Sequence, residues 1–157
     1  MLPQQSINLI RVLIADDHVL VREGLRKVLE MDYAIELTGD AATACETLFE
    51  LRRGAVDVVV LDLSMPGCTD VDLIERIVTG YPEVAVLVLT MHGDPHIARR
   101  ALDAGARGYL TKDISIDLLI DAVHQVAAGR SYVDPALTGA LICPPEPPQP
   151  LEQLSLR

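Results

Sequence analysis

The chain alternates between short, mostly apolar segments and longer segments in which apolar residues recur every three or four positions. The short segments consist mainly of Val, Ile and Leu, which is typical of parallel strands buried on both faces. The longer segments show the one-sided apolar stripe of amphipathic helices. We predict strands at Arg11–Ala15, Ile35–Asp40, Val56–Leu61, Val84–Leu89 and Gly108–Thr111. We predict helices near Val19–Met31, Thr43–Arg53, Val71–Tyr81, His96–Ala104 and Ile116–Ala128.

Local signals support these helices. Asp94 stands where it can cap the fourth helix, and Gly105 stands where that helix should end. The core-facing residues of the first helix should be Val21, Leu25, Val28 and Leu29, and those of the last helix Leu119, Val123 and Val126. The residues of the first helix that we expect to point largely outward are Arg22, Glu23, Arg26 and Lys27.

Regular alternation of strands and helices predicts an α/β fold, in which helices cover both faces of a parallel sheet through right-handed crossovers. For five strands we predict a flavodoxin-like, doubly wound (βα)5 sheet with strand order 2-1-3-4-5. The switch point of that order lies between the first and third strands. Asp16 and Asp17 follow the first strand and Asp62 follows the third, so the topology should bring three carboxylates into one crevice.

Three close carboxylates indicate a cation site. At an effective dielectric near 20 and a spacing of about 5 Å, each pair would repel by about 3 kcal/mol. The fourth strand leads to Thr90 and the fifth to Lys112, which adds a hydroxyl and an ammonium group to the same edge. A carboxylate nucleophile, a divalent cation, a lysine and a hydroxyl are what phosphoryl transfer requires, with an Asp62 oxygen attacking in line.

Composition narrows the function classes. The chain has 157 residues, which suits one domain, and a net charge of −10, which argues against direct binding of nucleic acid. The apolar stretches are too short to span a membrane, and Met1–Ser6 has no signal-peptide character. Three scattered cysteines fit neither a zinc pattern nor a disulfide framework. We therefore expect a cytoplasmic protein without a membrane partner.

A set of residues in a fixed order carries a family resemblance. The set comprises Asp16-Asp17, Asp62 with its Met65-Pro66-Gly67 loop, Thr90, and Tyr109 three residues before Lys112. On these positions, Met1 to about Arg130 resembles the receiver domain of two-component response regulators. Asp17–Leu25 resembles the opening of the NarL/FixJ class, whose members carry a LuxR-type helix-turn-helix after the receiver. Asp113 departs from receivers in which proline follows the lysine.

The resemblance implies a role for each matching residue. Asp62 would be the phosphoacceptor, which takes a phosphoryl group from a phosphohistidine of a sensor histidine kinase. The cofactor would be Mg²⁺, bound by Asp62, by Asp17 directly, by Asp16 mostly through water, and by the Ser64 backbone carbonyl. Lys112 would pair with a phosphoryl oxygen.

The resemblance also implies a switch in a phosphorelay that regulates transcription. Thr90 would move toward the phosphoryl group, and the Tyr109 ring would then enter the vacated space and change the surface around the fourth helix and fifth strand. The chain would not be an enzyme beyond phosphorylating and dephosphorylating itself at Asp62. It would form a homodimer through its first and fifth helices, with Ile116 and Ile120 as apolar surface or as core.

Each residue alone also has a plainer interpretation. The pair Asp16-Asp17 could cap the first helix, and Asp62 could be a solvated strand end. Lys112, Thr90 and Tyr109 could be a surface lysine, a β-favouring residue and half-buried core. The four histidines, His18, His92, His96 and His124, match no ligand spacing and are predicted to be non-ligands. His92 could still tune the lifetime of the phosphoryl group.

Two other functions compete with the switch. A haloacid-dehalogenase-like Mg²⁺ phosphatase also forms an aspartyl phosphate, but its general acid would stand at Ser64 and its nucleophile on the first strand. A degenerate receiver that only binds proteins is the other alternative, which the intact set of acids, hydroxyl and lysine disfavours.

We divide the chain into three parts. Residues 1–130 form the receiver, and residues 131–150 form a linker that holds five prolines between 142 and 150, with a short helix over Asp134–Leu141. Residues 151–157 resemble the start of a LuxR-type domain in a truncated protein, or they form a frayed tail. Contact with DNA would require an output domain that this chain lacks.

Overall fold

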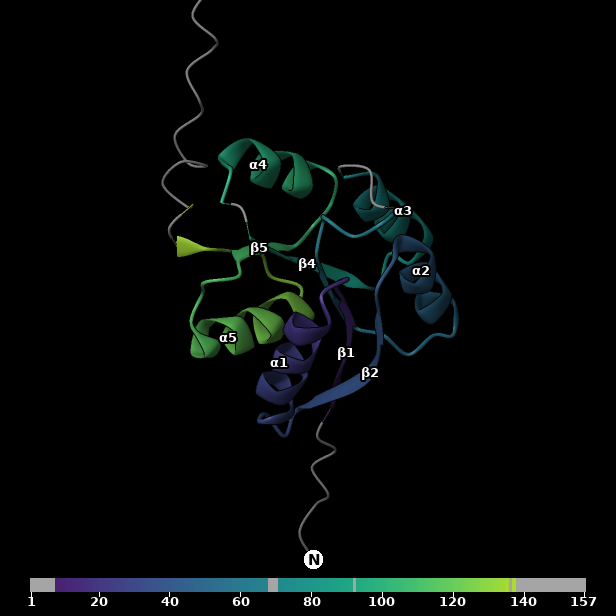
Figure 1. Cartoon of the computed structure of the whole chain (residues 1–157), viewed down its shortest axis with the longest axis vertical. Helices are drawn as coiled ribbons and strands as arrows, with labels where there is room; N and C mark the ends of the chain where they lie inside the picture. Colours follow the sequence, from purple (N-terminus) through teal and green to yellow (C-terminus); the bar gives the residue numbers. More distant parts are fainter. Residues whose placement is uncertain (1–7, 68–70, 92, 136, 138–157) are drawn as a thin grey trace, which may run out of the picture.

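The computed structural model describes residues 8–67, 71–91, 93–135 and 137. Strands and helices alternate along the chain (Figure 1). The strands are β1 (Ile10–Ala15), β2 (Ile35–Ala41), β3 (Val58–Leu61), β4 (Ala85–Thr90), β5 (Gly108–Thr111) and β6 (Tyr132–Val133). The helices are α1 (Val19–Glu30), α2 (Ala44–Arg52), α3 (Asp72–Gly80), α4 (Pro95–Asp103) and α5 (Ile116–Ala127). The five strands and five helices predicted between residues 11 and 128 are all present, each with its ends within two residues of the prediction.

The strands form one parallel sheet in the order β2-β1-β3-β4-β5-β6, which confirms the predicted flavodoxin-like topology. β6 was not predicted, because a strand of two residues is too short to show the alternation of apolar and polar positions. β6 pairs with β5, and the N–H of Asp134 donates to the carbonyl of Tyr109 at 2.9 Å. This pairing satisfies backbone groups of β5 that would otherwise lie at an open sheet edge.

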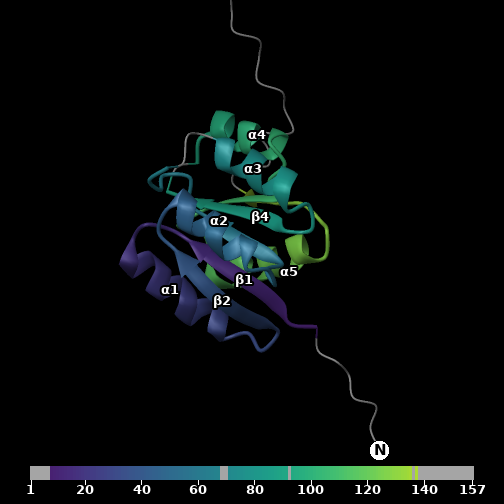
Figure 2. The same cartoon turned by 90° about the vertical axis from the view of Figure 1, so that its right-hand side faces the viewer.

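Two helical layers enclose the sheet: α1 and α5 cover one face, and α2, α3 and α4 cover the other (Figures 1 and 2). Side chains of β1 alternate between the layers. Val12 and Ile14 belong to the core cluster beneath α1 and α5, whereas Leu13 and Ala15 belong to the opposite cluster. All four are fully buried, which explains why β1 is apolar from Val12 to Ala15.

The helix ends largely follow the local sequence. The Asp94 side chain accepts a hydrogen bond from the N–H of His96 and caps α4, as predicted. Gly105 follows the end of α4 with φ +114, a conformation that suits glycine and confirms the predicted stop. The residue that caps α1 is His18, without a side-chain hydrogen bond, so neither Asp16 nor Asp17 caps this helix.

Strand register sets the edge where the site lies. Ala15 pairs with Leu61, so Asp16 and Asp62 leave adjacent strands at the same level. On the other side of β3, Thr90 pairs with Thr111, and the N–H of Lys112 donates to the Thr90 carbonyl at 2.7 Å. The carboxyl ends of four strands therefore deliver their polar residues to one edge.

No helix within the described ranges is both long and apolar enough to cross a membrane. Most of the predicted helix at 134–141, and all of residues 142–157, lie outside the part of the chain that the structure describes.

Candidate functional site

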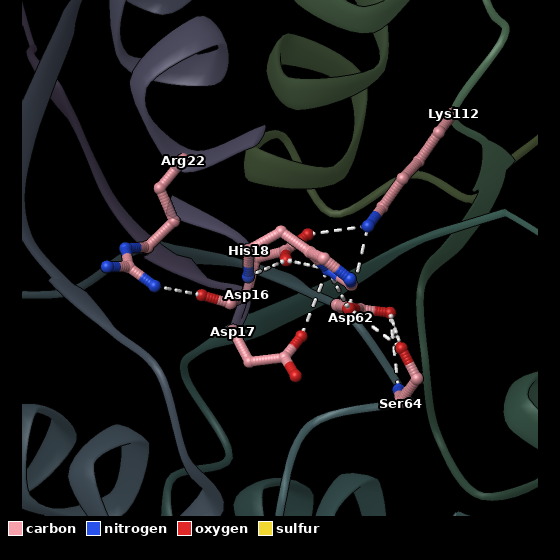
Figure 3. Close-up of polar contacts among 7 residues, drawn as sticks. All are labelled: Asp16, Asp17, His18, Arg22, Asp62, Ser64 and Lys112. Atoms are coloured by element: carbon pink, nitrogen blue, oxygen red, sulfur yellow. Dashed lines mark hydrogen bonds and ion pairs between the residues drawn. The ribbon is translucent and has the colours of Figure 1, made fainter. Parts of the chain in front are cut away.

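Three carboxylates meet at the carboxyl edge of the sheet (Figure 3). Asp16 and Asp62 are each 2% exposed, and Asp17 lies beside them half-buried. One oxygen of each, together with a nitrogen of His18, lies within 4.8 Å of the others. The structure therefore brings together the acids that the sequence predicted, as a compact cluster of negative charge.

Lys112 supplies positive charge to this cluster. Its Nζ lies 2.7 Å from Oδ2 of Asp16 and 3.5 Å from Oδ2 of Asp62, and its side chain is 8% exposed. Burial alone would raise the pKa of Asp16, but hydrogen bonds from Lys112 and the His18 backbone outweigh it and hold the pKa below 3.8. Lys112 is thus an internal counter-ion, not a solvated surface lysine.

Ser64 donates hydrogen bonds to the Asp62 carboxylate. The Ser64 hydroxyl lies 2.9 Å from both carboxylate oxygens, and the Ser64 N–H donates to Oδ1 at 3.2 Å. For Ser64 only a role of the backbone carbonyl was predicted, because the contact of its hydroxyl with Asp62, two residues earlier, depends on the turn that follows β3. These bonds fix the orientation of the carboxylate that we predict to be the nucleophile.

His18 lies inside the acidic cluster. Its Nδ1 is 3.1 Å from Oδ1 of Asp16, 3.1 Å from Oδ1 of Asp17 and 3.9 Å from Oδ2 of Asp62. The prediction that His18 is a non-ligand overlooked this location. The available signal was its position directly after the acidic pair at a strand end, and not any periodic spacing.

Arg22 supports the loop that carries the acids. Its guanidinium donates to the Asp16 carbonyl at 2.6 Å and lies 3.7 Å from Asp40 on β2. The prediction that Arg22 points largely outward is wrong, since its side chain is only 17% exposed. A long polar side chain on a helix can fold back to a backbone acceptor, which helical periodicity does not reveal.

Thr90 and Tyr109 lie on the strands that flank the site on its other side. Thr90 is 7% exposed at the end of β4. Tyr109 is fully buried, in the core cluster that contains Ala98 and Ala101 of α4. Burial, with a smaller effect of Asp94, raises the Tyr109 pKa to about 12. The Tyr109 ring thus points into the core. His92, which was predicted to tune the lifetime of the phosphoryl group, lies outside the described residues.

The donor set fits a hard divalent cation. Mg²⁺ prefers oxygen ligands and is usually bound by one or two carboxylates, keeping several waters. Within the described part of the chain, Oδ1 of Asp17 is a buried oxygen that accepts no hydrogen bond. A buried oxygen that accepts no hydrogen bond, beside two further carboxylates, is a group that a cation would satisfy.

Comparison with known proteins agrees with this geometry. The family described as the response regulator receiver domain matches residues 12–124. The transcriptional regulatory protein DegU of Brevibacillus brevis is 36% identical over 139 residues, which cover 88% of this chain and 59% of the relative. The response regulator UvrY of Escherichia coli K12 is 35% identical over 125 residues, which cover 80% of this chain and 57% of the relative. The chain thus spans less than two thirds of the length of these relatives.

Solved structures show the same fold. A two-component response regulator of the LuxR family from Aurantimonas sp. SI85-9A1 superposes with a TM-score of 0.81 at 31% identity, over 85% of this chain and 96% of the other. The response regulator RcsB in a complex with DNA superposes with a TM-score of 0.82 at 28% identity, over 93% of this chain and 74% of the other.

Proposed function

Because the chain belongs to the response regulator receiver domain family, we propose that it is a phosphorylation-dependent switch whose phosphoacceptor is Asp62. The family's relatives are two-component response regulators that control transcription. The observation that carries the assignment to Asp62 is the convergence of this buried carboxylate with Asp16, Asp17 and Lys112 at one sheet edge.

Asp17 and Asp62 would hold Mg²⁺, with Asp16 acting mostly through water and Ser64 through its carbonyl. The unsatisfied Oδ1 of Asp17 supports a direct contact, whereas the short bond between Asp16 and Lys112 supports an indirect one. When bound, Mg²⁺ supplies positive charge that neutralises the oxygens of the transferred group.

The protein's own residues orient the nucleophile. The Ser64 hydroxyl and N–H hold the Asp62 carboxylate, and one of its oxygens must give up the hydroxyl hydrogen bond before it attacks phosphorus. The new bond joins that oxygen to phosphorus, while the bond from phosphorus to the histidine nitrogen of the donor breaks. Lys112, already 3.5 Å from Asp62, is placed to pair with a phosphoryl oxygen.

Thr90 and Tyr109 would carry the signal away from Asp62. Thr90 would bind a second phosphoryl oxygen and the Tyr109 ring would fill the space beside α4. In this structure the ring is already buried against that helix, so the inward position is compatible with the packing. The readout would be a change in how the ring is held and in the surface of α4 and β5.

The partners follow from the same role. A sensor histidine kinase would donate the phosphoryl group, and DNA would be bound through an output domain outside residues 1–157. A homodimer would use α1 and α5, where Val19, Leu20 and Ile116 are 62%, 86% and 48% exposed. Ile120 is half-buried against the core, so it contributes less apolar surface than Ile116. We place this function in the cytoplasm.

Intact mass spectrometry after incubation with acetyl phosphate and Mg²⁺ tests the proposal. We expect one phosphoryl adduct, which EDTA prevents and which Asp62→Ala lacks. Steady release of phosphate from a phosphate ester would instead favour the phosphatase, although Ser64 stands where that enzyme needs an acid. Absence of an adduct, while Mg²⁺ demonstrably binds, would favour a module that only binds proteins.

A further inference from the structure

The imidazole of His18 lies where a side chain could bind the cation directly. The His18 N–H donates to Oδ1 of Asp16 at 2.8 Å, which turns the residue after β1 back over the sheet edge. The ring then lies among the carboxylates of Asp16, Asp17 and Asp62 (Figure 3). Nothing in the roles described so far uses this ring.

The distances from Nδ1 fit one coordination sphere. With metal–ligand bonds of 2.0–2.1 Å, adjacent ligands of an octahedron lie roughly 2.9 Å apart and opposite ligands about 4.1 Å apart. Nδ1 of His18 lies 3.1 Å from Oδ1 of Asp17 and 3.9 Å from Oδ2 of Asp62. The first distance matches neighbouring positions and the second matches opposite positions.

We propose that His18 is a direct ligand of the divalent cation through Nδ1, and that it shifts the preference of the site from Mg²⁺ toward Mn²⁺. This inference rests on the proposed function, because it assumes that the acidic cluster binds a cation. Nδ1 lies 3.1 Å from Oδ1 of Asp16, to which it can donate a hydrogen bond; as a metal ligand it would give up that bond and the ring proton would lie on Nε2, which the 58% exposure of the side chain permits.

The selectivity follows from ligand chemistry. Mg²⁺ strongly prefers oxygen ligands and gives up water reluctantly. Imidazole is a common ligand of first-row transition metals, and the affinity of a given site rises from Mn²⁺ onward along that series. Mn²⁺ shares with Mg²⁺ a preference for carboxylate and water ligands, but as a transition metal it accepts an imidazole more readily. Replacing one water or oxygen position by Nδ1 should therefore favour Mn²⁺ over Mg²⁺, relative to a site built from oxygen alone.

Electron spin echo spectroscopy of bound Mn²⁺ reads the contact directly. Nitrogen-14 modulation from a coordinated imidazole should be present in the wild-type protein and absent in His18→Ala. The control is His96→Ala, which removes an exposed histidine from α4 and should leave the modulation intact. Bound Mn²⁺ without nitrogen modulation in the wild type would overturn the inference but not the proposed function.

Metal affinity gives the second readout. By isothermal titration, His18→Ala should weaken Mn²⁺ binding about 10-fold or more and change Mg²⁺ binding by less than about 3-fold. A rise in both affinities would overturn the inference, since it would mean that the ring blocks the cation. The variant should fold, because His18 makes no side-chain cap and keeps its backbone N–H; circular dichroism checks this. Failure of the wild type to bind either metal would count against the proposed function itself.

Discussion

Replacing Asp62 by Asn should stabilise the fold when no divalent cation is present. The carboxylate is 2% exposed and lies within 4.8 Å of an oxygen of Asp16 and of Asp17. A buried carboxylate that binds a cation destabilises the folded protein when the cation is absent. Little water is then present to screen its repulsion from neighbouring carboxylates. Asn keeps the size and an oxygen acceptor for Ser64 but removes the charge.

The charged groups around Asp62 determine how much Asp62→Asn should change the free energy of unfolding. At an effective dielectric near 20, repulsion at 4.8 Å, the largest separation within the cluster, is about 3.5 kcal/mol per pair, so the two pairs together repel by about 7 kcal/mol or more. The attraction between Asp62 and Lys112, whose charged atoms lie 3.5 Å apart, offsets about 5 kcal/mol of this repulsion. The difference predicts that Asp62→Asn raises the free energy of unfolding by about 2 kcal/mol in EDTA.

Urea unfolding followed by circular dichroism, with EDTA and with Mg²⁺, measures this. The wild type should gain stability from Mg²⁺, and the variant should gain much less. Asp103→Asn, which removes an exposed charge at the end of α4, controls for the change in net charge and should shift stability by less than about 0.5 kcal/mol. Destabilisation by Asp62→Asn in EDTA would refute the electrostatic reasoning.

Three further predictions concern other buried groups of the fold. Lys112→Met should lower the free energy of unfolding in EDTA by about 3–5 kcal/mol, because it leaves the buried carboxylates without their counter-ion; urea titration that shows no loss would contradict the pairing. Since burial raises the Tyr109 pKa from 10.0 to about 12, the unfolded chain ionises first, and this residue's contribution to stability should be complete below about pH 10 and lost between about pH 10 and 12. Unfolding measured across that range should show a smaller decline for Tyr109→Phe, and an identical decline would contradict it. Asp134→Ala removes the side-chain acceptor of the Thr111 N–H and one of the two acceptors of the Thr111 hydroxyl, the other being Asp113, and should cost about 1–3 kcal/mol. Hydrogen exchange should quicken at β6, and unchanged protection there would speak against this anchor.

The sheet and the acidic cluster were predictable because both depend on patterns that are local in sequence. A stretch of strand buried on both faces must be apolar throughout, as β3 and residues Val12–Ala15 of β1 are, and the acids stand directly after these stretches. Topology then follows from few choices, because crossovers are right-handed and parallel strands end at one edge. Asp16, Asp62 and Lys112 are brought together by that edge alone.

What the sequence did not predict depends on side-chain direction. His18 enters the cluster because a backbone hydrogen bond to Asp16 turns the chain, and Arg22 folds back to a carbonyl that only the folded loop presents. The Ser64 hydroxyl reaches Asp62 through a tight turn. β6 forms by pairing with the edge of β5, and the sequence of two residues gives no sign of this tertiary contact. Each of these contacts depends on how elements lie relative to one another, which the periodic pattern of apolar residues in the sequence does not reveal.

The most direct measurement is the location of the phosphoryl group. Borohydride reduces an aspartyl phosphate to homoserine, so treatment of the phosphorylated chain, followed by peptide mass spectrometry, marks the acceptor. We predict homoserine at position 62 and at no other aspartate, Asp16 and Asp17 included. Homoserine at another position, or none in a chain that carries the added phosphoryl mass, would contradict the assignment of Asp62 as the phosphoacceptor.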